Sequence, residues 1–135
     1  IRAADLIVVE FPLWWSAPPA IMKGWFDKVF AMGVAWDGNH RYKNGLLSGK
    51  QCLVVTSAGD PADTYSPEGI HGATVEQHLY PLLHSTLAHA GLDVLKPFVT
   101  TGLTLAGDDE RQNALNALDE FLAQNMTTPQ FIYKH

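Results

Sequence analysis

The sequence has little of several features that define large classes of protein. It contains one cysteine, Cys52, so no disulfide can form within the chain, which fits a reducing compartment. No apolar run reaches the roughly 18 residues that a membrane helix needs, and the first residues lack the basic stretch of a secretion signal. The net charge of −5 argues against general binding to nucleic acid or anionic membranes. We therefore expect a cytoplasmic protein with no membrane segment and no nucleic acid partner.

Several catalytic and binding motifs are also missing. No Gly-x-Gly-x-x-Gly follows a predicted strand, and the phosphate-binding Gly-x-x-x-x-Gly-Lys-Ser/Thr loop is absent. No Gly-x-Ser-x-Gly elbow of the hydrolases occurs. Cys52 and His78 lack the spacing of a metal site. We expect neither a dinucleotide fingerprint nor a metal centre.

What is present is an alternation of apolar strands and amphipathic helices in 135 residues, 47% of them hydrophobic. The pattern predicts strands buried on both faces at 6–11, 51–56 and 92–100, and helices at 20–32, 73–90 and 110–124. Such alternation is typical of a parallel α/β sheet with right-handed crossovers. We expect one domain, residues 1–135. A doubly wound fold usually has about five strands or more, so we also expect roughly 50–60 further residues, a β-α-β segment, ahead of Ile1.

Finer expectations concern the helices. In helix 20–32 we expect Ile21, Trp25, Val29 and Met32 on one side, with Met22, Phe26 and Phe30 beside them. Pro81 should kink or split helix 73–90, and Gly91 should end it. Asp108 or Asp109 should cap the last helix. The residues expected on the inner face of that helix are Leu115, Leu118, Phe121 and Leu122.

Two loops that leave strand ends carry the residues most suited to binding, since ligands of open α/β sheets bind beyond the carboxyl ends of the strands. The first loop has adjacent tryptophans, Trp14 and Trp15, which either pack into the core and helix base or form a wall for a flat aromatic ligand. The second begins with small residues at 56–59 whose backbone N–H groups suit a polar heterocycle. Farther along it, Tyr65 and His71 could move a proton or stabilise an anion near a redox centre, although a loop histidine often has only a surface role.

Two segments resemble a known family. Residues 11–15 and 18–30, Phe-Pro-Leu-Trp-Trp and Pro-Pro-Ala-Ile-Met-Lys-Gly-Trp-Phe-Asp-Lys-Val-Phe, resemble a signature of the NAD(P)H:quinone oxidoreductases with a flavodoxin-like fold. Residues 65–72, Tyr-Ser-Pro-Glu-Gly-Ile-His-Gly, are similar to that family's second loop. The resemblance implies an α/β fold, a flavodoxin-like three-layer sandwich with a parallel sheet, here lacking its first β-α-β segment.

The resemblance also implies roles for individual residues. Trp15 matches a family tryptophan, whereas Trp14 stands where glutamine is common and Ser16 where an aromatic residue is common. Tyr65 and His71 match the pair that stabilises charge on the reduced flavin, Tyr65 also bordering the flavin, and Trp36 matches an aromatic residue that reaches into the partner subunit's site of a homodimer. The residues implied to border the flavin from the two loops are Pro12, Leu13, Trp14, Trp15, Ser16, Thr56, Ser57, Ala58 and Gly59.

The function implied is two-electron reduction of a quinone by NAD(P)H through a bound flavin, FAD or alternatively FMN. The flavin would carry the chemistry, while Tyr65 and His71 would stabilise charge. Two other functions remain open at this point: a regulatory subunit of a potassium-efflux system, as some members of the family are, or an interaction module without flavin.

Overall fold

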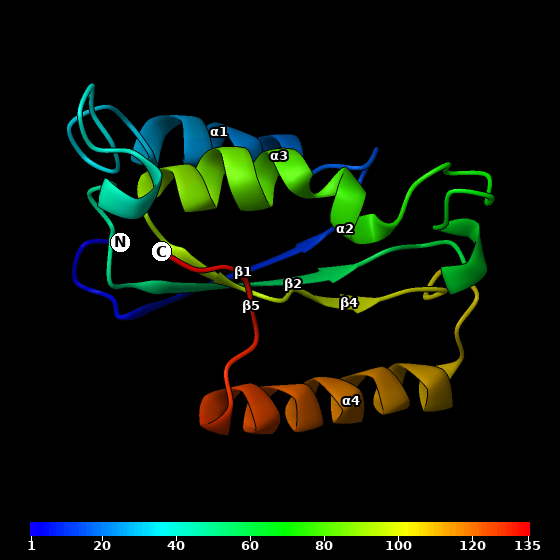
Figure 1. The fold of residues 1–135 in the computed structure, drawn as a ribbon. Helices are drawn as coiled ribbons and strands as arrows, with labels where there is room; N and C mark the ends of the chain where they lie inside the picture. Colours follow the sequence, from blue (N-terminus) through cyan, green and yellow to red (C-terminus); the bar gives the residue numbers. More distant parts are fainter.

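A computed structural model describes all residues from Ile1 to His135. Figure 1 shows a central sheet with α1, α2 and α3 on one side and α4 on the other, which is the three-layer sandwich expected. The strands are β1 Leu6–Pro12, β2 Gln51–Ser57, β3 Asp93–Leu95, β4 Phe98–Thr100 and β5 Phe131–Tyr133. The α-helices are α1 Ala20–Val29, α2 Val75–His78, α3 Tyr80–Leu82 and α4 Asp108–Thr127. Shorter turns of helix are η1 Tyr42–Asn44, η2 Ala62–Thr64, η3 Leu83–Leu87 and η4 Ala88–Ala90. No helix is long and apolar enough to cross a membrane.

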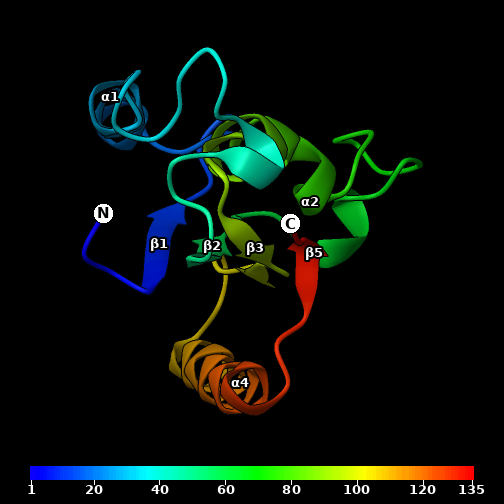
Figure 2. The same ribbon diagram turned by 60° about the vertical axis from the view of Figure 1, so that its left-hand side comes forward.

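The sheet has the strand order β1-β2-β3-β5 (Figure 2), and β4 also pairs with β2. Its pairings are parallel except for β3 with β5. The predicted single strand 92–100 is in fact two, β3 and β4, because Pro97 lacks the N–H that a continuous strand needs. The antiparallel strand β5 was not predicted, since three residues are too few to show a strand pattern.

Strand β1 lies at the edge of the sheet, and the prediction that it is buried on both faces is wrong. Val9 is only 5% exposed and packs in the core on the α1 side, but Val8 is 54% exposed. Helix α4 covers the other face only around β2 and β4, where Leu53 and Val55 contact its side chains. The outer face of β1 therefore has no covering element in this chain.

Helix α1 follows Pro18 and Pro19, as expected, but ends at Val29 rather than Met32. Its buried side is formed by Phe26, with Phe30 just beyond its end, whereas Ile21 is 88% exposed. The prediction had grouped Ile21, Trp25, Val29 and Met32 on one side, but only Val29 packs partly buried against the core and the other three are exposed. The buried stripe of α1 is narrow, because Phe26 is its one buried residue and Met22 and Val29 are only partly buried.

The segment after the long loop is helical but irregular, as Pro81 predicted. Thr74 and Gln77 form a capping box, and α2, α3, a π-helical turn and a 3-10 turn then follow without a break in the path. Pro81 lies in the first turn of α3, where its missing N–H costs least. Gly91 ends the segment with φ of 96°, a left-handed conformation that glycine adopts readily, as predicted.

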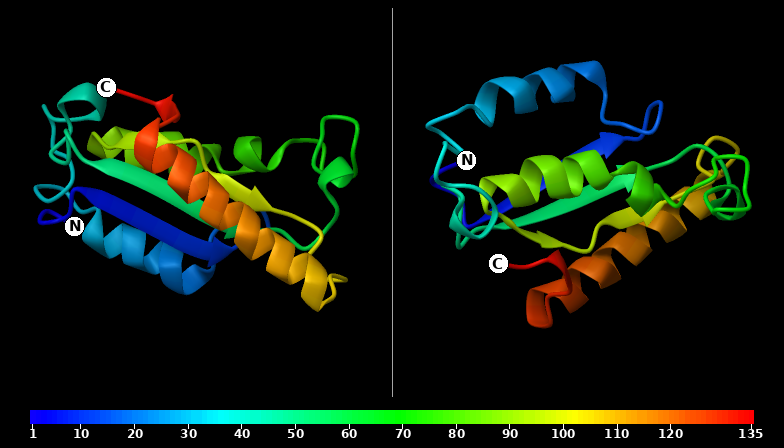
Figure 3. Two further views of the ribbon diagram at one scale, coloured as in Figure 1. Left: turned by 90° about the horizontal axis from the view of Figure 1, so that it is seen from below. Right: turned by 45° about the horizontal axis from the view of Figure 1, so that its top comes forward.

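Helix α4 crosses beneath the sheet (Figure 3) and begins one residue after its N-cap, Gly107. The predicted caps, Asp108 and Asp109, lie instead in the first turn, and the carboxylate of Glu110 accepts the Gly107 N–H at 2.8 Å. Of the four residues expected on its inner face, Leu118, Phe121 and Leu122 pack against the sheet, while Leu115 is mostly exposed.

Candidate active site

The carboxyl ends of β1, β2 and β4 meet at one edge of the sheet, at the right of Figure 1. Three loops leave this edge and are tied together by backbone hydrogen bonds. The Leu13 N–H donates to the Ser57 carbonyl at 2.8 Å, and the Ala58 N–H donates to the Thr100 carbonyl at 2.8 Å. The two loops singled out in the sequence therefore meet, and residues 101–107 form a third side.

The two tryptophans lie on a tight turn between β1 and α1. Trp14 and Ala17 exchange backbone hydrogen bonds of 2.9 and 3.0 Å, and the residues between them have left-handed backbones, with φ of 50° at Trp15 and 60° at Ser16. This pattern is that of a type I′ turn. Trp15 is fully exposed and Trp14 is 60% exposed, so neither packs in the core. The aromatic surface of this turn is thus available to a ligand.

The second loop begins with residues that serve the fold. Thr56 is buried, and its hydroxyl donates to the Phe11 carbonyl at 2.8 Å, so its side chain is occupied between β1 and β2. Ala58 is also buried. A Cβ at Gly59 would lie only 2.6 Å from Thr104 Oγ1. Because glycine has no Cβ, the third loop can approach the second this closely.

Free backbone donors occur in both predicted binding loops. The N–H groups of Trp15 and Ser16 in the first loop, and of Gly59 and Asp60 in the second, donate to no group of the chain. A heterocycle with ring carbonyl and imine acceptors, stacked on an exposed indole, is the kind of ligand that such a donor set fits. The residues present are therefore compatible with a flavin ring.

Tyr65 and His71 are brought together, although five residues separate them in sequence. Their rings stack with centroids 4.1 Å apart and an interplanar angle of 6°. The loop is closed by η2, by the His71 N–H donating to the Thr64 carbonyl at 3.2 Å, and by Gly69, where a Cβ would lie 2.3 Å from the Thr64 carbonyl oxygen. The structure therefore brings these two side chains into contact, and their role stays a prediction.

Two residues around this pair were missed by sequence analysis. His71 Nε2 lies 2.9 Å from Asp60 Oδ2, and the ring of His78 is perpendicular to both Tyr65 and His71. The His78 Nε2 atom is buried without a hydrogen-bond partner. Nothing in the spacing of these residues marks them, because the irregular loop between them has no period.

A cavity of about 500 Å³ lies between the strand ends and α4. It is lined by three of the expected cofactor residues, Pro12, Thr56 and Ser57, together with Arg111 from α4. Neither the tryptophan turn nor the Tyr65–His71 pair lines it. The predicted site residues therefore divide between this cavity and the more open surface of the loops.

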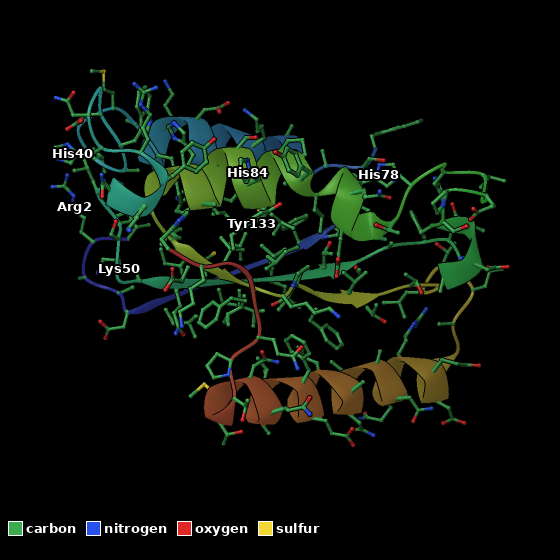
Figure 4. The ribbon with its side chains drawn as sticks, in the orientation of Figure 1. Arg2, His40, Lys50, His78, His84 and Tyr133 are labelled. Carbon is green, nitrogen blue, oxygen red and sulfur yellow. The ribbon has the colours of Figure 1, made fainter.

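Trp36 lies apart from the other predicted site residues. Its indole N–H donates to the Phe30 carbonyl at 2.9 Å, and its ring meets that of His89 edge-on. It lines a second cavity, of about 390 Å³, between α1 and the helical segment after α2. In Figure 4 the loop that follows it, marked by His40, lies at the opposite end of the sheet from His78.

Comparison with known proteins assigns this chain to a family. The sequence profile of the family described as flavodoxin-like fold matches residues 1–124. The chain belongs to this family. The family assignment agrees with the parallel sheet, the three layers and the loops at the strand ends described above.

Individual members of the family are similar over most of the chain. The human ribosyldihydronicotinamide dehydrogenase [quinone] is 38% identical over 90% of this chain and 52% of its own length. The guinea pig (Cavia porcellus) NAD(P)H dehydrogenase [quinone] 1 is 36% identical over 85% of this chain and 42% of its own length. The chain thus spans about half the length of these curated relatives.

Solved structures agree in fold. A Klebsiella pneumoniae protein assigned as a quinone reductase superposes with a TM-score of 0.87 at 35% identity, covering 96% of this chain and 52% of its own. General stress protein 14 of Treponema denticola, solved in complex with FMN, superposes with a TM-score of 0.74 at 27% identity, covering 90% of this chain and 65% of its own.

Proposed function

We propose that this chain is part of a flavin-dependent NAD(P)H:quinone oxidoreductase and that Tyr65 and His71 are its catalytic residues. The observation that carries the proposal is the stacked Tyr65–His71 pair at the carboxyl edge of the sheet, beside two loops with free N–H donors. The names of the relatives, which are quinone dehydrogenases, support the same reaction class.

The chain's own groups have separable tasks in this reaction. A bound flavin supplies two-electron chemistry, accepting a hydride equivalent from a reduced nicotinamide and delivering it to a quinone. Trp15 and Trp14 offer apolar area against a flat ring, and the free N–H groups of the two loops orient its polar edge. The phenol of Tyr65 offers a hydrogen-bond donor where negative charge develops, and the imidazole of His71 stacked on it offers a ring nitrogen that can exchange a proton.

The remaining cofactor residues support the site from within the fold. Leu13 fixes the first loop to β2 through its N–H, and Thr56 fixes β2 to β1 through its hydroxyl. Pro12 and Ser57 line the cavity at the strand ends. These residues therefore fix the position of the two loops that would contact the flavin ring, and they offer little contact surface to the ring themselves.

The main test is replacement of His71. In a His71→Ala variant, we expect stopped-flow reduction of the bound flavin by NADH or NADPH to slow by about 100-fold, because a positioned acid–base group contributes about 10²–10⁴-fold. Flavin affinity, measured by fluorescence titration, should change little. Equal reduction rates in the two proteins would remove His71 from the mechanism.

The identity of the flavin is a separate part of the proposal. We propose FAD, with FMN as the alternative, since the similar T. denticola protein was solved in complex with FMN. Acid release of the cofactor from the purified protein, followed by mass spectrometry, distinguishes the two by the adenosine monophosphate portion.

We also propose that the protein acts in the cytoplasm as a homodimer. The buried, unpaired thiol of Cys52 accords with a reducing compartment. The distance of the Trp36 loop from the chain's own catalytic pair accords with a contribution to a partner's site. Light scattering measures the mass in solution, and Trp36→Ala should weaken both dimerisation and quinone turnover.

An enzyme is favoured over the two other functions by the catalytic pair and by the relatives. A channel regulator or a flavin-free module needs no stacked acid–base pair beside ring-binding loops. A yellow protein bleached by NADH supports the enzyme, whereas a colourless protein that does not oxidise NADH contradicts it.

A further inference from the structure

We propose that Asp60 is a positioning residue for the catalytic pair: its carboxylate accepts the Nε2–H of His71 and fixes the imidazole ring on Tyr65. The proposal rests on the function proposed above and adds a residue to that site. Asp60 and His71 are 11 positions apart, and their contact of 2.9 Å joins the two ends of the second loop.

The chemistry of the contact assigns the hydrogen atom. An ionised carboxylate only accepts hydrogen bonds, so the ring nitrogen that faces it must carry a hydrogen. The ring of His71 is therefore protonated at Nε2. Its other nitrogen, Nδ1, has no partner in the chain. Asp60 thus decides which nitrogen of His71 is available for exchange of a proton with a bound substrate.

The imidazole is held on three sides. Tyr65 covers one face at 4.1 Å, Asp60 holds Nε2, and His78 is perpendicular to both stacked rings. The centroid of His78 is 6.4 Å from that of Tyr65 and 6.3 Å from that of His71. Because these distances are nearly equal, His78 lies beside the stack rather than above it.

The Asp60 backbone is held as well. Its carbonyl accepts the Gly102 N–H at 2.8 Å, and the preceding Gly59 carbonyl accepts the Thr104 N–H at 3.4 Å. These bonds tie Asp60 to the third loop, so its position does not depend on His71 alone. The Asp60 side chain is about half exposed, at 53%, so little packing holds it against His71. Asp60 therefore orients the imidazole through the hydrogen bond.

The test compares Asp60→Ala, which removes the acceptor, with Asp60→Asn, which keeps an amide oxygen in the same place. Asp63→Ala is the matched control, because Asp63 is an exposed aspartate of the same loop with no side-chain partner. The first readout is the NMR resonances of the His71 ring protons, which the ring current of the stacked Tyr65 shifts upfield. The second is stopped-flow flavin reduction together with flavin affinity.

We expect Asp60→Ala to lose the upfield shift and to slow flavin reduction about tenfold, because an imidazole that is no longer held in one orientation is less often placed for reaction. Flavin affinity should stay within about twofold. Asp60→Asn should keep the shift and most of the rate, and Asp63→Ala should match the unaltered protein.

Two results would overturn the inference: unchanged ring shifts and rate in Asp60→Ala, or equal losses in Asp60→Ala and Asp60→Asn. The resonances of Phe121, on the far side of the sheet, show whether each variant is folded. If the unaltered protein reduces no flavin, the proposed function fails, while the ring shifts still decide whether Asp60 positions His71.

Discussion

The thiol of Cys52 lies within β2 and has no exposed surface. Burial raises its pKa to about 12, because the thiolate would lose its hydration. We therefore expect no reaction of the native protein with Ellman's reagent at pH 8 over minutes, and one equivalent of reaction in guanidinium chloride. The thiolate is the reactive form, and the buried thiol must reach solvent before it can ionise. Rapid labelling of the native protein would therefore show that β2 opens readily.

Single residues could be singled out from the sequence where their motif is distinctive. Tyr65 and His71 were singled out together, and the structure stacks their rings, while their role stays a prediction. Asp60 and His78 were missed, because their contacts depend on a loop path set by η2 and Gly69 rather than by a repeating pattern. The exposure of both tryptophans was also left open, since a Trp-Trp sequence is compatible with burial or with a binding wall.

At the scale of elements, the turn from Trp14 to Ala17 combines a tight hairpin with two non-glycine residues at positive φ. Left-handed backbone costs an L-residue about 1–2 kcal/mol, and glycine avoids most of this cost. We expect Ser16→Gly to raise the free energy of unfolding by about 0.5–1 kcal/mol, measured by urea denaturation.

Ser16→Ala is the matched control for this turn. It removes the same hydroxyl but keeps a Cβ at φ of 60°, so no gain in stability is expected. A gain of equal size in both variants would mean that the hydroxyl, not the backbone, is responsible. Flavin affinity of the two variants then reports whether the turn's conformation matters to binding.

The elements themselves were predicted in type and order, and their ends were predicted less well. Helix α4 is longer than expected at both ends, because Glu110 caps it through Gly107 and its last turn continues to Thr127. Strand 92–100 divides at Pro97, a residue whose effect on pairing could have been read from the sequence. Strand β5 depends on Asn125, whose side chain donates to the Phe121 carbonyl and accepts the Gln130 N–H at the turn from α4.

For the molecule as a whole, His89 links stability to pH. Burial, followed by the positive charge of Arg41 and then His84, lowers the pKa of His89 below its usual 6.5. A lowered pKa means that folding favours the neutral ring. This contribution to stability is present above the unfolded value of about 6.5 and is lost as the pH falls through the lower folded value.

We therefore expect the free energy of unfolding to decrease from pH 7 to pH 5, with a shallower decrease in His89→Gln. Charging His89 also brings a positive ring against Tyr42 and near His84, which contacts Tyr133 of β5 (Figure 4). Urea denaturation at several pH values measures the slope. The same slope in both proteins would show that His89 titrates alike in the folded and unfolded states.

The layer order and parallel sheet could be inferred from the alternation of apolar and amphipathic segments alone. The burial of β1 could not, because an apolar run shows that a strand is suited to burial and not that this chain supplies both covers. The proposed homodimer and the proposed flavin could not be inferred from this alternation, and only the resemblance to a known family suggested them.

The long connection between β1 and β2 has a consequence for synthesis. Leu6 pairs with Gln51, so β1 is made 45 residues before the start of its partner, since 51 − 6 = 45. At about 5–20 residues per second, β1 waits about 2–9 s for β2 to be synthesised. The edge of β1 that β2 will occupy stays unpaired during this time. An apolar strand with an unpaired edge is a template for pairing with other chains, so this edge needs protection until β2 docks.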